Sequence, residues 1–360
     1  MKKLLCIIIL LLSGISAHAQ NENKIILITL DGLRWEELFG GADSTLINHE
    51  PISGNVSSLK AKFWRETKEE RRKALFPFFW NEVENMGVLA GNRWVNSYVN
   101  LTNKGAFSYP GYSEILTGFA DDRINSNSKI NNPNVTILEF LNNTPRYSGR
   151  VLAFGSWDVF PFIINEERSR IPVNAGYRPA LTNNLSDRER LINNMQSQTP
   201  RRWGAVRFDT FTHNYALEAL KNQKPIITYI AYGETDDFAH DQRYDHYLYS
   251  AHATDAMIKE LWDYTQKDEF YKDKTTFIIA TDHGRGKSLA GSDSNWGSHG
   301  SDVSGASNTW LVAFGNTIPH KGELMDGEQY FNNQIATTIS IILGQNYTGH
   351  GKAGKPIFFK

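Results

Sequence analysis

The feature that most constrains the fold of this 360-residue chain is a set of apolar runs that each end in an acidic group. The clearest run, Thr275–Ala280, is β-branched and aromatic, which is typical of a buried strand. It stops at Thr281, and Asp282 and His283 follow directly. Ligands of open α/β sheets bind beyond the carboxyl ends of the strands. We therefore expect Asp282 and His283 to lie at a ligand site.

Two further runs repeat this pattern. Lys24–Leu30 is a continuous apolar strand that ends at Asp31, and Pro225–Tyr232 is followed by a stretch that contains Asp236 and His240. The last two residues are four positions apart, so one helical turn places both on one face, a spacing that can hold one metal ion. Taken alone, Asp31 is better explained as a loop or N-cap aspartate.

Strand-like runs alternate with helical segments along the chain. This alternation predicts an α/β fold in which helices flank a mostly parallel central sheet within a single large domain. Ser57–Arg72, rich in Lys, Arg and Glu, is predicted to be a solvated helical insertion, and the polar segment Asn183–Asn214 an excursion or lid. Further strands are expected at Arg150–Phe154 and Thr309–Gly315, and further helices at Tyr244–Tyr264 and Gln334–Leu343.

Residues 1–19 predict a secretory signal peptide. They combine a basic start, an apolar core from Leu4 to Leu12 and a cleavage site that ends at Ala19. The apolar core is too short to be a membrane anchor. We therefore expect residues 20–360 to form a periplasmic or secreted protein with no transmembrane segment. The single cysteine, Cys6, lies in the leader, so a metal in the mature chain must be held by His, Asp, Glu or hydroxyl groups.

A helical pattern begins near Ser108 and stops at Gly118. Serine is a favoured N-cap and Pro110 suits the first helical turn, which explains Ser108 structurally. The same geometry would put the Ser108 hydroxyl at a positive helix end, where phosphate or sulfate oxyanions bind. A serine coordinated there to a metal would be an activated nucleophile. In the loop that follows, Asn125 and Asn127 could donate amide hydrogen bonds to a ligand, although turn formation is the simpler explanation for both.

Together these groups supply enough ligands for two metal ions. His299, which lies in a Gly- and Ser-rich segment after Asp282, and Ser108 at the helix start add two more potential ligands to those at the acidic strand ends. A two-metal centre clamps the attacking and leaving oxygens of an in-line phosphoryl displacement. The net charge of −1 gives no reason to expect a nucleic-acid partner.

Five motifs stand in an order that resembles the alkaline phosphatase superfamily, and most closely its nucleotide pyrophosphatase/phosphodiesterase branch. The motifs are LDG at 30–32, Ser-x-Pro at 108–110, Asp-x-x-x-His at 236–240, TDHG at 281–284 and GSHG at 297–300. The resemblance extends from Lys24 to the C-terminal segment Gly351–Ile357 and implies an alkaline-phosphatase-like fold with two zinc ions. The implied ligands of one ion are Asp236, His240 and His299, and those of the other are Asp31, Asp282, His283 and Ser108.

The resemblance also implies a mechanism. Ser108 would attack phosphorus and form a covalent phosphoseryl intermediate, which a metal-activated hydroxide would then release. An asparagine soon after the nucleophile helix would hold a phosphate oxygen, and both Asn125 and Asn127 are near the expected place. Members of the diesterase branch commonly have Thr at the position of Ser108. Manganese or iron could replace zinc at carboxylate-rich sites.

Two departures from related branches bear on the substrate. Monoesterases use a Lys-x-Arg pair after a middle strand, where this chain has Ser156-Trp157-Asp158 and no cation. A dianionic monoester would lack its charge partner, which favours a diester. Sulfatases share the Ser-x-Pro motif but continue to an Arg where this chain has Tyr112, and they begin with paired aspartates where this chain has only Asp31.

The expected function is therefore that of an exported metal-dependent hydrolase of a small-molecule phosphate ester, with a phosphodiester favoured. The alternatives are a sulfatase-like, phosphomonoesterase or mutase-like phosphotransferase activity on the same scaffold and, ranked last, a non-catalytic metal- or anion-binding protein. The leaving group is expected against the loops near Trp35, Trp157 and the Asn183–Asn214 excursion. The sequence determines neither the natural substrate nor the oligomeric state.

Overall fold

The structure is a computed structural model that describes residues 23–180, 184–291 and 293–358. The predicted signal peptide, with its cleavage site at Ala19, lies outside these residues. Within the described ranges, no helix combines the length and the apolar character that crossing a bilayer requires.

Within these ranges, the central sheet has eight strands in the order β10-β2-β9-β7-β1-β6-β4-β5. At its centre, β1 (Lys24–Leu30) lies between β6 (Ile227–Tyr232) and β7 (Thr275–Thr281) and pairs with both in parallel. Among the described strands of this sheet, β9 (Leu311–Gly315) is the one that runs antiparallel to both of its neighbours, β7 and β2 (Gly87–Ala90). The predicted α/β class with a mostly parallel sheet is confirmed.

The other elements complete this frame. The remaining strands are β3 (Tyr98–Asn100), β4 (Val151–Gly155), β5 (Val173–Ala175), β8 (Asn308–Thr309), β10 (Gly322–Glu323) and β11 (Gln329–Phe331), of which β11, β3 and β8 form a separate three-stranded sheet. The α-helices are α1 (Trp35–Gly40), α2 (Ser44–Ile47), α3 (Glu50–Ser53), α4 (Val56–Phe63), α5 (Lys68–Leu75), α6 (Glu84–Met86), α7 (Ser108–Thr117), α8 (Ile137–Asn142), α9 (Phe160–Ile163), α10 (Glu166–Ser169), α11 (Asp187–Gln198), α12 (Asp209–Asn222), α13 (Glu234–His240), α14 (Tyr244–Lys267) and α15 (Ile335–Ile342). A π-helical turn, η1 (Phe79–Val83), and three 3₁₀ turns, η2 (Arg93–Val95), η3 (Asn332–Gln334) and η4 (Gly349–Gly351), join them.

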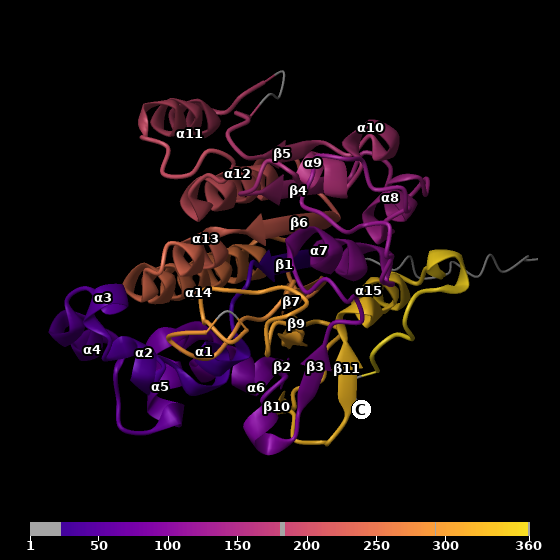
Figure 1. Cartoon of the computed structure of the whole chain (residues 1–360). Coiled ribbons are helices and arrows are strands. Elements are labelled where there is room, and N and C mark those ends of the chain that lie inside the picture. The colour runs from indigo at the N-terminus through magenta and orange to yellow at the C-terminus, as the bar shows by residue number, and fades with distance from the viewer. Residues whose placement is uncertain (1–22, 181–183, 292, 359–360) are drawn as a thin grey trace, which may run out of the picture.

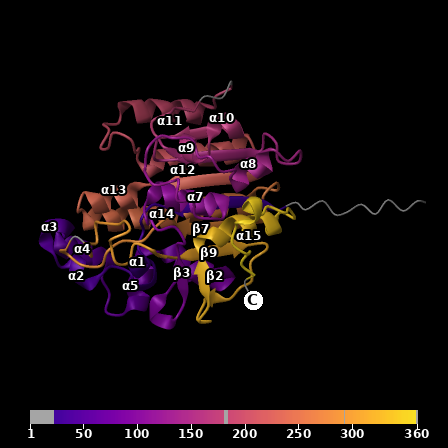
Figure 2. The ribbon, with the colours of Figure 1, turned by 45° about the vertical axis from the view of Figure 1, so that its right-hand side comes forward.

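Helices cover both faces of the sheet. Alternate residues of β1 point to opposite faces, so Ile26 and Ile28 pack toward α12, α14 and the N-terminal helices, whereas Ile25 and Leu27 pack toward α7, α8, α9 and α15. Figures 1 and 2 show α1 to α5 gathered at the end of the sheet beside β2, and α8 to α11 at the opposite end beside β4 and β5.

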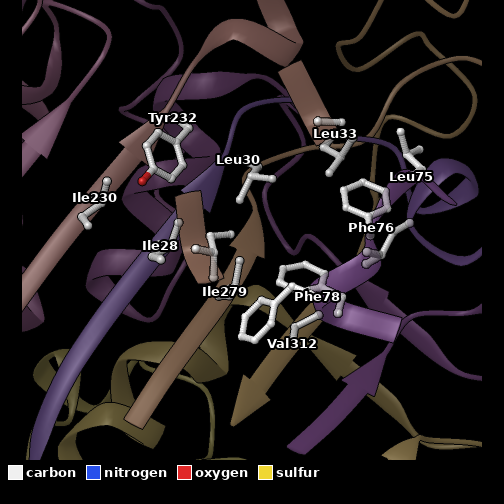
Figure 3. Packing of buried hydrophobic residues seen from close by; sticks show 14 of the residues in the cluster. Ile28, Leu30, Leu33, Leu75, Phe76, Phe78, Ile230, Tyr232, Ile279 and Val312 are labelled. Atoms are coloured by element: carbon white, nitrogen blue, oxygen red, sulfur yellow. The ribbon is translucent and has the colours of Figure 1, made fainter. Parts of the chain in front are cut away.

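The core on the face of the sheet covered by α12 and α14 is dense and aromatic. Figure 3 shows side chains of β1, β6, β7 and β9 meeting those of the segment before η1. The labelled residues are Ile28, Leu30, Leu33, Leu75, Phe76, Phe78, Ile230, Tyr232, Ile279 and Val312. Each such apolar side chain contributes about 1.5–3 kcal/mol when it is removed from water, so this packing holds the strand ends in a fixed relation.

The outcome for the predicted elements is uneven. The strong strands and the long helix α14 lie where the sequence placed them. The segment Ser57–Arg72, predicted as a solvated helix or helical insertion, forms two helices, α4 and α5, separated by residues 64–67. The short strands β2, β3, β5, β10 and β11 were not predicted, because runs of two to four residues carry too little periodicity to be distinguished from loops.

Strand register decides which residues meet at the sheet edge. In β1, Leu30 is the Cα partner of both Tyr232 in β6 and Thr281 in β7. The residues that follow these three positions therefore lie level with one another, which sets Asp31 beside Asp282 and begins α13 next to both.

Helix α7 approaches this edge closely because it carries Gly111. A Cβ atom at Gly111 would lie 2.2 Å from the carbonyl oxygen of Asp282, which is far inside van der Waals contact.

Helix α7 starts one residue earlier in the chain than the N-cap interpretation of Ser108 requires. Phe107 is the N-cap, and Ser108 is the first helical residue and makes no capping bond. The interpretation of Ser108 as a capping residue is therefore wrong.

We predict that Gly111→Ala lowers the free energy of unfolding by about 1–3 kcal/mol, because the added methyl group overpacks the contact with Asp282. Gly204→Ala is the matched control, since a Cβ atom at Gly204 meets nothing within 4 Å. Urea unfolding of both variants measures the difference. Equal stabilities of the two variants would contradict the close packing of α7 on β7.

Candidate metal centre

The first ligand cluster lies at the shared end of β1 and β7. It contains Asp31, Asp282 and His283, all buried. Nε2 of His283 lies 3.3 Å from Oδ1 of Asp31 and 3.5 Å from Oδ2 of Asp282. Gly32, at a φ of +56°, donates its N–H to the other oxygen of Asp282 at 3.0 Å. The two carboxylates thus each direct one oxygen at the same imidazole nitrogen.

The second cluster adds residues from α13 and from the loop after β7. Asp236 and His299 form a metal-compatible group with His283. His240, one turn after Asp236 in α13, places its Nε2 atom 3.2 Å from Oδ2 of Asp236 and 3.0 Å from Nε2 of His299. The rings of His283 and His299 stack with their centroids 4.0 Å apart. The structure therefore brings together every residue that the sequence nominated as a metal ligand.

The spacing of these atoms fits tetrahedral metal coordination. Ligand atoms at about 2.0–2.1 Å from a zinc ion are about 3.3 Å from one another at tetrahedral geometry. The separations within both clusters lie close to this value. In addition, Oδ1 of Asp31 and Oδ2 of Asp282 are buried and have no hydrogen-bond partner among the described residues. Buried carboxylate oxygens without a partner are costly, and a cation between them would remove that cost.

The electrostatics of the site agree with this assignment. Burial, and next the charge of Asp236, raise the pKa of the Asp31 carboxyl well above its usual range. Burial, and next the charge of Asp31, raise the pKa of Asp282 in the same direction. Burial lowers the pKa of His299 to about 2, so its imidazole is neutral at physiological pH. A neutral imidazole has the free lone pair that a metal ligand needs.

Ser108 lies beside the first cluster. It is buried, and its Oγ atom lies 3.4 Å from Nε2 of His283. The Nδ1 atom of His283 lies 2.9 Å from the carbonyl oxygen of Gly284. Because a carbonyl only accepts, Nδ1 carries the proton and Nε2 presents its lone pair toward Ser108 and the carboxylates.

A buried network holds the segment that leads into Ser108. Glu114, one to two turns into α7, accepts the backbone N–H groups of Thr102 and Asn103 at 2.8 Å each. The side chain of Asn103 in turn accepts the N–H of Ala106, a residue with a φ of +48°. This network stabilises an unfavourable backbone conformation two residues before Ser108.

The two candidate asparagines differ in position. Oδ1 of Asn127 accepts the backbone N–H of Tyr109 at 3.0 Å, directly beside Ser108. This bond orients the carboxamide and leaves its NH₂ group available to a ligand at the helix start. Both asparagines are exposed, but no side-chain hydrogen bond of Asn125 occurs within the described part of the chain.

Two buried residues of the site were missed by sequence reasoning. The hydroxyl of Tyr112 donates to Oδ2 of Asp31 at 2.9 Å, so the residue that differs from the sulfatase motif contacts a candidate metal ligand. The guanidinium of Arg285 is fully buried and forms a short hydrogen bond with Oδ1 of Asp236. Although burial alone would raise the pKa of Asp236, Arg285 and then His240 hold it well below its usual range. The available signal was position: Arg285 follows the Asp282-His283-Gly284 turn directly.

The two tryptophans near the expected position of the leaving group have different surroundings. Trp35 is buried, and its ring centroid lies 4.5 Å from that of Trp94, so its side chain serves packing. Trp157 forms a β-bridge with Val206, which joins the loop after β4 to the predicted excursion.

The position of the missing Lys-x-Arg pair is also informative. The hydroxyl of Ser156 donates to the buried carboxylate of Asp209 at 2.5 Å. Oδ2 of Asp158 lies 2.7 Å from Nζ of Lys129, which comes from the loop after α7. A cation is therefore present near this position, but it is supplied by another loop.

Comparison with known proteins identifies the fold. No protein-family model matches the chain, and no curated protein matches it in sequence. Solved structures do match. Wild-type alkaline phosphatase PafA superposes with a TM-score of 0.60 at 12% identity, over 94% of this chain and 98% of that chain.

Two other matches have related descriptions. A protein in the alkaline phosphatase superfamily from Vibrio parahaemolyticus gives a TM-score of 0.50 at 14% identity, over 93% of this chain and 70% of that chain. The phosphonate monoester hydrolase from Silicibacter pomeroyi gives 0.54 at 14% identity, over 93% and 76%. The chain therefore has the alkaline-phosphatase-like fold that its motifs resemble.

We predict that divalent metal raises the melting temperature, and that the rise is larger at pH 8 than at pH 5. Folding raises the pKa values of Asp31 and Asp282, so without metal the folded state loses stability as pH rises above about 4. Metal binding requires the charged carboxylates and removes this loss. At a free metal concentration of a hundred times Kd the gain is about 2.7 kcal/mol.

Differential scanning fluorimetry with zinc and with a chelator measures this effect. Asp282→Asn should abolish most of the metal-induced shift, and Asp122→Asn, at an exposed position, should retain it. A shift that is independent of pH, or one that persists in Asp282→Asn, would argue against these carboxylates as ligands.

Proposed function

We propose that this chain, whose fold is that of the alkaline phosphatase superfamily, is a metal-dependent hydrolase of phosphate esters that prefers phosphodiesters. The observation that carries the proposal is the position of Ser108. Its hydroxyl lies at the start of a ten-residue helix, 3.4 Å from His283, in a buried cluster that also holds two unpartnered carboxylate oxygens. The leader-like sequence of residues 1–19 supports export of the enzyme.

Two metal ions, most simply zinc, would be held by the two clusters. Asp31, Asp282, His283 and Ser108 would hold one ion, and Asp236, His240 and His299 the other. The Oδ2 atom of Asp236 is the oxygen available to its metal, because Oδ1 bonds to Arg285. When bound, the metals supply Lewis-acid stabilisation of the phosphoryl oxygens and favour ionisation of the serine hydroxyl.

The protein residues then have defined roles. Oγ of Ser108 attacks phosphorus in line with the leaving oxygen; an Oγ–P bond forms as the bond from phosphorus to the leaving oxygen breaks. The proton of the Ser108 hydroxyl passes to the leaving oxygen. Water then attacks phosphorus, the Oγ–P bond breaks, a proton from the water restores the Ser108 hydroxyl, and a phosphate monoester is released. The Tyr112 hydroxyl and the Gly32 N–H hold Asp31 and Asp282 in their orientations, so the site is organised before substrate binds.

Charge favours a diester over a monoester. A monoester presents a dianionic phosphoryl group, which requires additional cationic partners. At the middle strand this chain offers Ser156, whose hydroxyl is already bonded to Asp209. The nearby cation, Lys129, is neutralised by Asp158. The metals and an amide donor suffice for the single charge of a diester.

We assign the substrate-oxygen contact to Asn127 rather than to Asn125. The bond from the Tyr109 N–H to Oδ1 of Asn127 leaves the amide NH₂ group as a donor beside Ser108. A phosphoryl oxygen attached to phosphorus near Ser108 is the natural acceptor.

The central test is kcat/KM of the zinc-loaded protein, residues 20–360, on a 4-nitrophenyl phosphodiester and on 4-nitrophenyl phosphate. We expect the diester to be favoured by about tenfold or more, because the monoester lacks its charge partner. Ser108→Ala should lose at least about a thousandfold of the activity.

Results other than these would each contradict one part of the proposal. A monoester preference would overturn the diester assignment. Full activity of Ser108→Ala would overturn the nucleophile. Turnover of a 4-nitrophenyl sulfate above that of both phosphates would overturn the substrate class, and activity that survives a strong chelator would overturn metal dependence.

A second prediction separates the two asparagines. Asn127→Ala should reduce kcat/KM for the diester by about 10–100-fold, the value of one hydrogen bond to a charged group. The matched variant Asn125→Ala should stay within about twofold of wild type, because Asn125 lies in the same loop but its side chain forms no hydrogen bond to α7 within the described residues. Steady-state kinetics of both variants decide the assignment, and a reversed order would move the contact to Asn125.

A further inference from the structure

A pocket separate from the metal clusters lies beyond the ends of β4 and β5. Its volume is about 440 Å³. It is lined by Lys129, Asp158, Phe162, Ala175, Tyr177, Arg178, Arg201 and Gly204. None of these residues belongs to the metal clusters, and the proposed reaction does not use the cations among them.

The charge around this pocket is positive. Lys129 pairs with Asp158 at 2.7 Å, and Arg178 pairs with Glu166 at 2.6 Å. Arg201 has no carboxylate partner within the described ranges, and its side chain is exposed. Three cations therefore face two carboxylates, and the uncompensated positive charge belongs to Arg201.

The side chain of Arg201 is held against an aromatic wall. Its guanidinium carbon lies 4.1 Å above the centre of the Tyr177 ring. The hydroxyl of Tyr177 donates to the carbonyl oxygens of Trp203 and Val206, each at 2.7 Å. Because its hydroxyl holds the Tyr177 ring in place, the guanidinium of Arg201 lies over the ring face, and its N–H donors remain available to a ligand in the pocket.

Two links connect this pocket to the residues around Ser108. The hydroxyl of Tyr109, next to Ser108, donates to the carbonyl oxygen of the pocket residue Phe162 at 3.1 Å. Lys129 lies two residues after Asn127, so their Cα atoms are within about 7 Å. A substrate held at Ser108 and Asn127 can therefore extend into this pocket.

We propose that the Lys129–Arg201 pocket binds a second oxyanion of the substrate, a phosphate or carboxylate carried on the organic group away from the reacting phosphorus. This inference rests on the proposed function and narrows its substrate class to diesters with a further anionic group. Arg201 is the main partner, since Asp158 already neutralises Lys129. Arg201 forms charge-assisted hydrogen bonds with the oxyanion.

The test uses pairs of 4-nitrophenyl phosphodiesters. Within each pair the second ester group is the same alkyl chain, which ends in a phosphate in one compound and in a hydroxyl in the other, and the chain length is varied between pairs. For the zinc-loaded wild type at the best length, kcat/KM should favour the phosphate-ended compound by about tenfold or more. Added salt should reduce the preference.

Arg201→Gln should reduce this preference to about one while leaving kcat/KM for the hydroxyl-ended compound unchanged. Arg202→Gln is the matched control, because Arg202 is the next residue but pairs with Asp241 at 2.8 Å and does not line the pocket. It should retain the full preference. No preference in the wild type at any length, or a preference that survives in Arg201→Gln, overturns the subsite.

A binding measurement separates failure of the subsite from failure of the proposed function. Calorimetry on zinc-loaded Ser108→Ala compares an alkane bisphosphate with the corresponding alkyl monophosphate. Tighter binding of the bisphosphate that is lost in Ser108→Ala/Arg201→Gln supports the subsite even if no diester is hydrolysed. Equal affinities for the two ligands contradict the subsite, whatever the catalytic activity.

Discussion

The burial of several carboxylates beside one imidazole is the constraint on which the rest of this structure depends. Asp31 and Asp282 are level with each other at the ends of neighbouring parallel strands, and each directs an unpartnered oxygen at His283. Burying an uncompensated charge costs several kcal/mol. The raised pKa values of both carboxyls reflect this cost. A cation bound between the carboxylates would offset it by neutralising their charge. The glycines at 32 and 111 let backbone and helix α7 come close enough to enclose the cluster.

The structure separates the reacting centre from the surfaces that select a substrate. The centre is built on the ends of β1, β6 and β7 and on the start of α7, which are among the most deeply packed elements. The surfaces that would contact the organic group come from loops: the one after α7, which carries Asn127 and Lys129, and the one that contains Arg201. Loops of this kind can vary without disturbing the packed frame, so the proposed function assigns the chemistry and the substrate preference to different parts of the chain.

The candidate metal ligands were the most predictable part of the site, and their neighbours the least. Asp236 and His240 were recognised from their spacing within one helical turn, a local relation. Asp31 on its own was better explained as a cap, and its role emerged from its place among other strand ends. By contrast, Tyr112 and Arg285 carry no local signal of their contacts, because their partners lie far away in the sequence. Lys129 was missed as a cation near the middle strand for the same reason.

By itself, the sequence determined the α/β class, the main strands and the set of metal-ligand candidates, because hydrophobic periodicity and residue chemistry are properties of short segments. The tertiary structure decided the register of β1 against β6 and β7, the first-turn position of Ser108 facing His283, and the hydrogen bond from the Tyr109 N–H to Asn127. These relations join residues up to 251 positions apart in the paired strands, such as Leu30 and Thr281. Only the packing of the whole core fixes such pairs, since no local preference of either segment specifies its partner.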